Sequence, residues 1–196
     1  NKTYTCNVII PNFDTLYATT TIPKSVNIYN PQVNQICGYD DEGYPYPSIS
    51  FSFNNNPNID EFFEANLYKV SSYDQDYYYK CYVYKPSDPV ILNEGTGFPG
   101  FSNNIIKDSL YQMEISYTYW NGSKPDDEYV FMLMKLSNEY YKYIKYLYSY
   151  YDYLNSIEEI NIGILKPIYS YSNVKNGYGV FAGISITKTD TLSPIR

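Results

Sequence analysis

Residues 110–119 read Leu-Tyr-Gln-Met-Glu-Ile-Ser-Tyr-Thr-Tyr, and this stretch decides the fold class. Aromatic or apolar side chains occupy every second position, namely Tyr111, Met113, Ile115, Tyr117 and Tyr119, and polar side chains occupy the positions between them. Because successive side chains of a β-strand point to opposite faces, the pattern predicts a strand with one buried face and one face in water. Such half-exposed strands are typical of antiparallel sheets.

The same alternation extends outward from this strand in both directions. Residues 48–53 read Ser-Ile-Ser-Phe-Ser-Phe, which places three apolar side chains on one face. Further strands are predicted near 4–10, 16–22, 62–70, 77–85, 129–136 and 178–189. Residues 129–136 are apolar on both faces except at Lys135, which predicts a central strand covered by another element. Segments rich in Asn, Gly and Pro predict loops at 54–58, 95–104 and 121–127.

A helix over about 137–154 is the predicted cover of that central strand. Apolar and aromatic side chains recur there at spacings of three and four, at Tyr140, Ile144, Leu147, Tyr151 and Leu154. Polar residues occupy the other face, at Asn138, Lys142, Lys145, Ser149 and Asp152. Ser137 is the expected N-cap, and Glu139 suits the first turn. Its many tyrosines fit an amphipathic helix lying on the sheet, with a stacking platform for a ligand as the alternative.

The composition excludes several classes of function. Among 196 residues, 14 are basic and 21 acidic, giving a net charge of −7, so no basic surface for nucleic acid is expected. The sequence has no histidine, which removes Ser-His and Cys-His catalytic pairs. No stretch of 18 apolar residues is present, as a membrane-spanning helix would require. The strand-like pattern begins at Asn1 itself, so we expect the natural protein to extend further at its N-terminus.

Three cysteines, Cys6, Cys37 and Cys81, lack metal-binding or redox spacing. Any two of them form a candidate disulfide that leaves one thiol over, and the alternative is three structural thiols. Cys81 alternates with Tyr77, Tyr79 and Val83, which predicts that it lies on a buried face.

Acidic residues gather at 40–42, 126–128 and 158–159. Paired carboxylates could hydrolyse glycosides, and hard cations such as calcium prefer oxygen ligands. Clusters of this kind in loops are more often solvated turns, and no calcium-loop, P-loop or G-x-S-x-G motif is present. We therefore assign no catalytic residue, no metal ligand and no cofactor, and expect a protein that is not an enzyme.

Two aromatic patches are the candidate binding sites. Trp120 falls in phase with the polar positions of its strand and is followed by Asn121 at a turn. An exposed tryptophan there could stack on a sugar ring or a partner protein, whereas a twist of the strand would bury it. Tyr82 and Tyr84 beside Lys80 form the second patch.

Several segments in order resemble one family. They are Tyr4–Val8, Leu16–Pro23, Ile49–Phe53, Phe62–Tyr68, Leu136–Leu147 and Ser172–Gly183, the last reading Ser-Asn-Val-Lys-Asn-Gly-Tyr-Gly-Val-Phe-Ala-Gly. Together they resemble the Bacteroidota outer-membrane lipoproteins of domain-of-unknown-function 4249. The acidic residue that the family has after the third segment is asparagine here, at Asn54.

This resemblance implies a mainly β, antiparallel sandwich with Ig-like elements and one substantial amphipathic helix. Residues 1–24 would be the last strands of an N-terminal Ig-like domain, and 25–196 a β-rich C-terminal domain. The family implies a secreted protein, lipid-anchored at the outer membrane, that assists a TonB-dependent receptor in nutrient capture, with a glycan or a peptide as candidate ligand. A structural or adhesive surface protein and a carbohydrate-active enzyme are the alternatives. The last of these segments, Ser172–Gly183, is called the closing motif. It is expected to be structural, with a turn at Asn176-Gly177 and a close backbone approach at Gly179.

Overall fold

The computed structural model describes residues 1–71, 77–95, 98–118, 124, 127–155 and 170–195, with only the backbone described at 151–155. Contacts divide the chain into two compact units. The hairpin–helix unit comprises residues 1–24 and 136–185, and the sandwich unit comprises 25–135 and 186–196. The boundary between residues 24 and 25 is the one predicted for the end of the N-terminal strands. Residues 1–24 do not stand alone, however, because they form one unit with residues 136–185.

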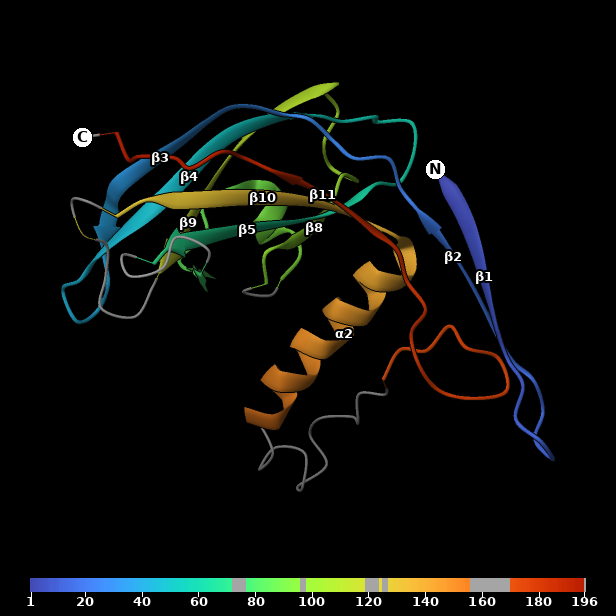
Figure 1. The fold of residues 1–196 in the computed structure, drawn as a ribbon. Coiled ribbons are helices and arrows are strands. Elements are labelled where there is room, and N and C mark those ends of the chain that lie inside the picture. Colours follow the sequence, from blue (N-terminus) through green and yellow to red (C-terminus); the bar gives the residue numbers. More distant parts are fainter. Residues whose placement is uncertain (72–76, 96–97, 119–123, 125–126, 156–169, 196) are drawn as a thin grey trace. The chain divides into compact units, whose positions relative to one another are not determined.

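The sandwich unit contains two sheets (Figure 1). The first has the order β3-β4-β9-β7, formed by β3 (Ile28–Tyr39), β4 (Pro45–Asn54), β9 (Leu110–Thr118) and β7 (Tyr82–Val83). The second has the order β11-β10-β5-β6, formed by β11 (Ile184–Lys188), β10 (Tyr129–Leu136), β5 (Phe62–Val70) and β6 (Tyr78–Lys80), and β8 (Gly100–Ser102) also pairs with β5. The pairings of β3 with β4, β4 with β9, β7 with β9, and β5 with β6 and β8 are antiparallel. The predicted mainly β, antiparallel sandwich is confirmed.

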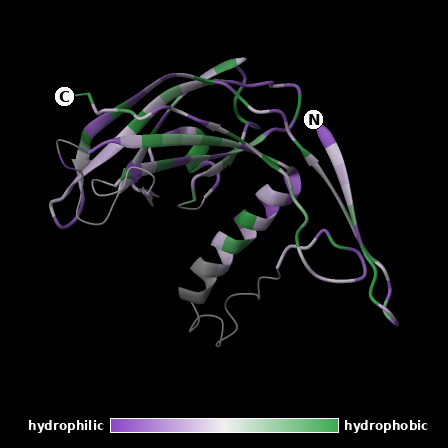
Figure 2. Cartoon of the chain, viewed as in Figure 1, coloured by the Kyte–Doolittle hydropathy of each residue, from purple (hydrophilic) through white to green (hydrophobic). Residues whose placement is uncertain are grey.

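One hydrophobic core joins the inner faces of the two sheets. Its buried side chains include Ile49, Phe51, Phe53, Met113 and Ile115 from the first sheet and Phe63, Leu67, Phe131 and Leu133 from the second. The rings of Phe51 and Phe131 contact each other across the core with centroids 4.5 Å apart. The five side chains from the first sheet are those that the alternation placed on an inner face. Figure 2 shows β10 of the second sheet as hydrophobic along much of its length. Burying one such side chain contributes roughly 1.5–3 kcal/mol.

The hairpin–helix unit holds the remaining long elements. β1 (Lys2–Val8) and β2 (Leu16–Ile22) form an antiparallel hairpin in register from Lys2↔Ile22 to Val8↔Leu16. The predicted helix is α2 (Asn138–Asn155), and Ile144 on it is buried as expected while Lys142 is exposed. Tyr140, Leu147, Lys145 and Ser149 are all half-buried, so the two faces are less distinct than the sequence predicted.

Two predicted strands are corrected by the structure. The single strand expected at 77–85 is two short strands, because the chain leaves one sheet after β6 and joins the other at β7. Cys81 lies at this crossing and is buried, as predicted, but Tyr77 and Tyr79 of its supposed face are exposed. The strand expected at 178–189 is confined to β11, since 178–183 form a loop.

Two further short elements lie between residues 86 and 104. The strand β8 occurs within the predicted loop 95–104, and a single helical turn, α1 (Pro89–Leu92), occurs where no element was predicted. Asp88 caps α1 by accepting a hydrogen bond from the Val90 amide at 2.8 Å.

All three cysteines are free thiols, so the predicted alternative of a disulfide is wrong.

Candidate functional site

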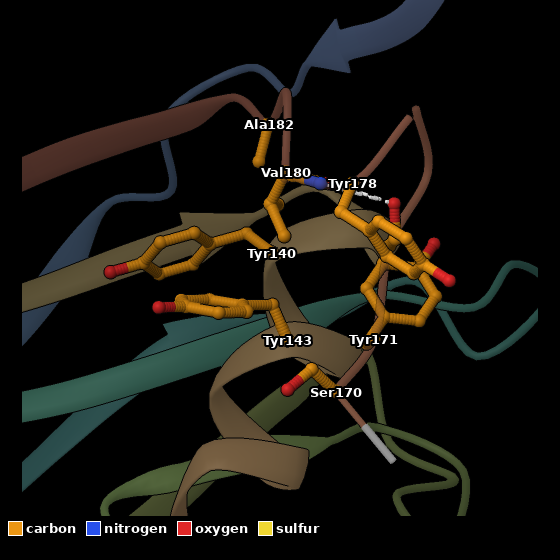
Figure 3. A pocket seen from close by; sticks show the side chains of 9 residues that line it. Tyr140, Tyr143, Ser170, Tyr171, Tyr178, Val180 and Ala182 are labelled. Carbon is orange, nitrogen blue, oxygen red and sulfur yellow. Dashed lines mark hydrogen bonds between the residues drawn. The ribbon is translucent and has the colours of Figure 1, made fainter. Parts of the chain in front are cut away.

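A pocket of about 490 Å³ lies within the hairpin–helix unit. Its walls include four tyrosines and two small apolar side chains: Tyr140, Tyr143, Tyr171, Tyr178, Val180 and Ala182. Figure 3 shows Tyr140 and Tyr143 on one side and Tyr171 and Tyr178 on the other. Pockets of this size and aromatic character are typical of small-molecule sites.

The start of α2 positions the first wall. Ser137 caps the helix, with its Oγ accepting hydrogen bonds from the amides of Tyr140 at 3.3 Å and Gly183 at 3.2 Å. The Ser137 amide also donates to the Gly183 carbonyl at 2.8 Å. Tyr140 and Tyr143 are three residues apart and therefore share one side of the helix, with ring centroids 6.4 Å apart. Ser137 thus fixes where the helix begins and also holds the start of the helix beside Gly183, at the end of the closing motif.

Residues 172–183, here called the closing loop, form the second wall. The Asn173 side chain joins its two arms, because Oδ1 accepts from the Phe181 amide at 2.9 Å and Nδ2 donates to the Phe181 carbonyl at 2.8 Å. Ser172 Oγ donates to the Gly179 carbonyl at 3.0 Å and accepts from the Gly179 amide at 3.2 Å (Figure 3). These bonds hold Tyr171 and the 178–182 arm on the same pocket.

The closing loop is also tied to the β1–β2 hairpin. The backbones of Tyr17 and Lys175 exchange hydrogen bonds of 3.3 and 2.8 Å, and Asn176 Nδ2 donates to the Thr15 carbonyl at 3.0 Å. A Cβ at Gly177 would lie 2.7 Å from Leu16 Cδ2, and one at Gly183 would lie 2.7 Å from Ile22 Cγ1. The structural role expected for the motif is therefore present.

The close approach predicted at Gly179 is wrong. A Cβ there would meet its nearest neighbour, Val174 Cγ2, at an ordinary 3.5 Å. What Gly179 supplies is its backbone conformation, since its φ of +149° is one that side chains with a Cβ rarely adopt. The predicted turn at Asn176-Gly177 is confirmed, with φ of +61° at Asn176.

The described lining of the pocket is rich in hydroxyl groups. Besides tyrosines, the lining residues that the structure describes include Ser170 and Ser172, and none of them is Asp, Glu, Lys or Arg. Burial, and then the charge of Glu139, raises the pKa of Tyr171, so its phenol is protonated at neutral pH. The hydroxyls of Ser170, Tyr143 and Tyr178 form no hydrogen bond with any part of the chain that the structure describes. They remain available to a ligand as donors and acceptors.

Of the binding residues predicted from the sequence, the two that the structure describes, Tyr82 and Tyr84, do not line this pocket. Trp120 and Asn121 lie outside the described residues. Tyr82 is exposed on β7, as expected for a contact surface. Tyr84 instead packs against Tyr46 with ring centroids 5.0 Å apart. Lys85 Nζ lies over the Tyr84 ring, 4.9 Å from its centroid. The structure therefore does not join these residues into one described site.

The acidic clusters form turns and ion pairs where they are described. Asp40 Oδ1 accepts hydrogen bonds from the amides of Glu42 at 3.0 Å and Tyr44 at 2.8 Å, which is the arrangement of a solvated turn. Asp127 pairs with Lys69 at 2.7 Å. Asp126, Glu158 and Glu159 lie outside the described residues. Within the described ranges, no three Cys, Asp or Glu side chains gather as metal ligands.

A second surface feature is the exposed end of the β1–β2 hairpin. Ile9 and Phe13 are 79% and 75% exposed, and Val8 and Ile10 beside them are also exposed. Figure 2 shows hydrophobic colouring at this end of the hairpin. Contiguous exposed apolar side chains of this kind often mark a contact with another protein or a membrane.

Comparisons of the chain with protein-family models, curated proteins and solved structures find no match. The family resemblance carried by the sequence segments thus stays a prediction. Among the described helices, none is both long and apolar enough to cross a membrane.

Proposed function

We propose that this protein is a non-catalytic ligand-binding protein whose site is the tyrosine-lined pocket of the hairpin–helix unit. The observation that carries the proposal is the lining itself, four tyrosines from α2 and from the segment 171–178 around about 490 Å³. Tyrosine offers a large rigid apolar face with a polar tip, which suits recognition of a ligand with few conformational costs. Hydrogen bonds at Ser137 and Asn173 hold both walls in place before a ligand arrives.

The chemistry of the lining supports binding over catalysis. Glycoside hydrolysis needs two carboxyl groups facing the scissile bond, and the lining residues that the structure describes include none. Its serine hydroxyls have no base beside them among the lining residues, and the chain has no histidine to serve as one.

The proposed setting is the outer membrane, where a lipid anchor outside residues 1–196 would hold the protein beside a TonB-dependent receptor. The sequence resemblance supports this setting. The apolar end of the β1–β2 hairpin supports a protein partner, because Ile9 and Phe13 would lose unfavourable exposure to water on contact. The pocket would then present a captured nutrient to the receptor.

The test of the binding function is a screen of sugars, short peptides and amino acids by calorimetry, with product analysis for turnover. Tyr143→Ala should weaken any bound compound at least about tenfold, as expected for a central aromatic contact. Tyr150→Ala, an exposed tyrosine of the same helix outside the lining, is the matched control and should bind normally. Chemical turnover of a bound compound would refute the non-catalytic proposal.

The partner is tested separately with a purified TonB-dependent receptor, which the proposed setting implies. Phe13→Ser should reduce receptor binding, because Phe13 is 75% exposed at the hairpin end. Tyr143→Ala should bind the receptor as the natural chain does. Absence of receptor binding by the natural chain would favour the structural or adhesive alternative.

A further inference from the structure

We infer that the tyrosine-lined pocket binds a neutral saccharide, with a sugar ring stacked on the side chains of Tyr143 and Tyr171. This inference rests on the proposed function, because it assigns a ligand class to the same site. It uses three properties of the pocket: the uncharged lining that the structure describes, its open hydroxyl groups and its size.

The described lining favours a neutral ligand. Phosphates, uronic acids and free amino acids carry charges that a site recognises with Arg, Lys or carboxylate partners. No such side chain is among the lining residues that the structure describes, and the net charge of −7 on the chain disfavours anions further. A neutral ligand is the class that this lining can hold without leaving a charge unpaired.

The aromatic and hydroxyl groups together match a sugar. One face of a pyranose ring presents C–H groups that pack on an aromatic ring, while its edge presents hydroxyls that both donate and accept. The lining includes tyrosine rings from α2 and from residues 171–178, and the hydroxyls of Tyr143, Tyr178 and Ser170 also donate and accept. A proline-rich peptide would present mainly carbonyl acceptors and would need an extended groove.

The shape agrees with a short saccharide. A volume of about 490 Å³ falls in the usual range for small-molecule sites and has room for about one or two sugar rings. Tyr178 is 97% exposed at the pocket, so its ring is free to settle on a bound ligand. A longer glycan would therefore be held by one end or by one branch.

The experiment titrates the whole chain with defined probes. The neutral probes are maltotriose, cellotriose, xylotriose and mannotriose, the charged probe is trigalacturonic acid, and the peptide probe is hexaproline. Calorimetry measures affinity, and saturation-transfer NMR identifies the ligand protons in contact. We expect at least one neutral trisaccharide to bind with Kd below about 1 mM, with less than about a twofold change between 50 and 500 mM NaCl, because no ion pair contributes.

Substitutions locate the bound sugar. Tyr143→Ala and Tyr171→Ala should each weaken it at least about tenfold, and Tyr143→Phe, which keeps the ring, should weaken it only about threefold. Tyr150→Ala is the folded control on the same helix and should not change the affinity. Thermal unfolding of each variant shows that the fold is kept. Saturation transfer should be strongest at the C–H protons of one sugar face.

Each other outcome overturns the inference. Binding of trigalacturonic acid or hexaproline in preference to every neutral sugar would refute the saccharide class, but would leave the proposed function standing if Tyr143→Ala abolished it. Sugar binding unaffected by Tyr143→Ala and Tyr171→Ala would refute this pocket as its site. Failure of all neutral probes at about 10 mM would refute the inference. Failure of every compound in the wider screen would refute the proposed function as well.

Discussion

Replacing Asn173 by alanine should detach the two arms of the closing loop from each other. The side chain makes hydrogen bonds of 2.9 and 2.8 Å with the amide and carbonyl of Phe181, and a weaker one of 3.4 Å with the Thr19 carbonyl. Each bond contributes about 0.5–1.5 kcal/mol net, and the half-buried Phe181 amide loses its partner. We therefore expect the free energy of unfolding of the hairpin–helix unit to fall by about 1.5–3 kcal/mol.

The assay combines urea unfolding, followed by circular dichroism, with hydrogen exchange at the Phe181 amide. That amide should exchange at least about tenfold faster in Asn173→Ala, since local opening becomes easier by more than about 1.4 kcal/mol. Asn173→Asp keeps the acceptor for the amide and loses the donor, so its effect should be intermediate. Ligand affinity should also fall, although Asn173 is not among the pocket's lining residues.

The matched control is Asn138→Ala, an exposed asparagine at the start of α2 whose side chain forms no hydrogen bond with the described part of the chain. Its free energy of unfolding should stay within about 0.5 kcal/mol of the natural chain. If Asn173→Ala also stays within that range and the Phe181 amide keeps its protection, the loop is not held by this side chain. The account of how the second wall is positioned would then be wrong.

Three further predictions concern the sandwich unit. Lys135 and Glu61 form a largely buried ion pair, so Lys135→Met should lower the free energy of unfolding by about 3–5 kcal/mol in urea titrations, and adding Glu61→Gln should restore part of the loss. Cys37 is exposed, whereas burial raises the pKa of Cys81 to about 12, so maleimide at about pH 7.5 should label Cys37 and spare Cys81 in peptide mapping. Burial holds the pKa of Tyr117 well above its ordinary value of 10.0, so its contribution to stability is complete below about pH 10 and is lost as the pH rises further. Tyr117→Phe should therefore lessen the loss of stability measured by unfolding between about pH 10 and 12, and an unchanged pH profile would contradict this cause.

The strands that the sequence predicted well are those whose neighbours lie in a regular ladder. β4 and β9 have apolar side chains at every second position that the core buries, so a period of two is visible in their residues. β5 and β10 are instead buried on both faces at most positions. For β5 and β10 the predicted bounds, 62–70 and 129–136, are those of the structure. The alternation of side chains in β4 and β9 follows from the local geometry of a strand alone.

β3 was not predicted because its ladder with β4 is irregular. The register shifts between Tyr29 and Gln32 and again between Asn34 and Gly38. Asn30 has a φ of +49°, and a proline follows it, so the first irregularity breaks the alternation of side chains. Of the residues in this strand, only Val33 is fully buried, which leaves no apolar stripe to detect.

The pocket was hidden from the sequence for a different reason. Its tyrosines come from two segments about 30 residues apart, and tyrosine is so frequent, at 28 of 196 residues, that none of them stands out. The stacking-platform alternative concerned the tyrosines of the helix as a group and singled out none of them. What the sequence could not show is that Ser137 ties the start of α2 to Gly183, which depends on a contact between distant segments.

The closing loop shows why a structural motif and a binding site can be the same residues. Asn173, Gly177 and Gly183 lie against residues of the β1–β2 hairpin and fix the loop on it. The sequence predicted a structural role for the motif but not these three anchors. The same bonds place Tyr178 and Val180 between those anchors, where their side chains line the pocket. Substitutions at the anchors should therefore reduce stability and affinity together, whereas substitutions at Tyr143 or Tyr178 should reduce affinity alone. Separate effects of the two groups of substitutions on stability and on affinity would distinguish a preformed binding site from tyrosines that only cover the helix.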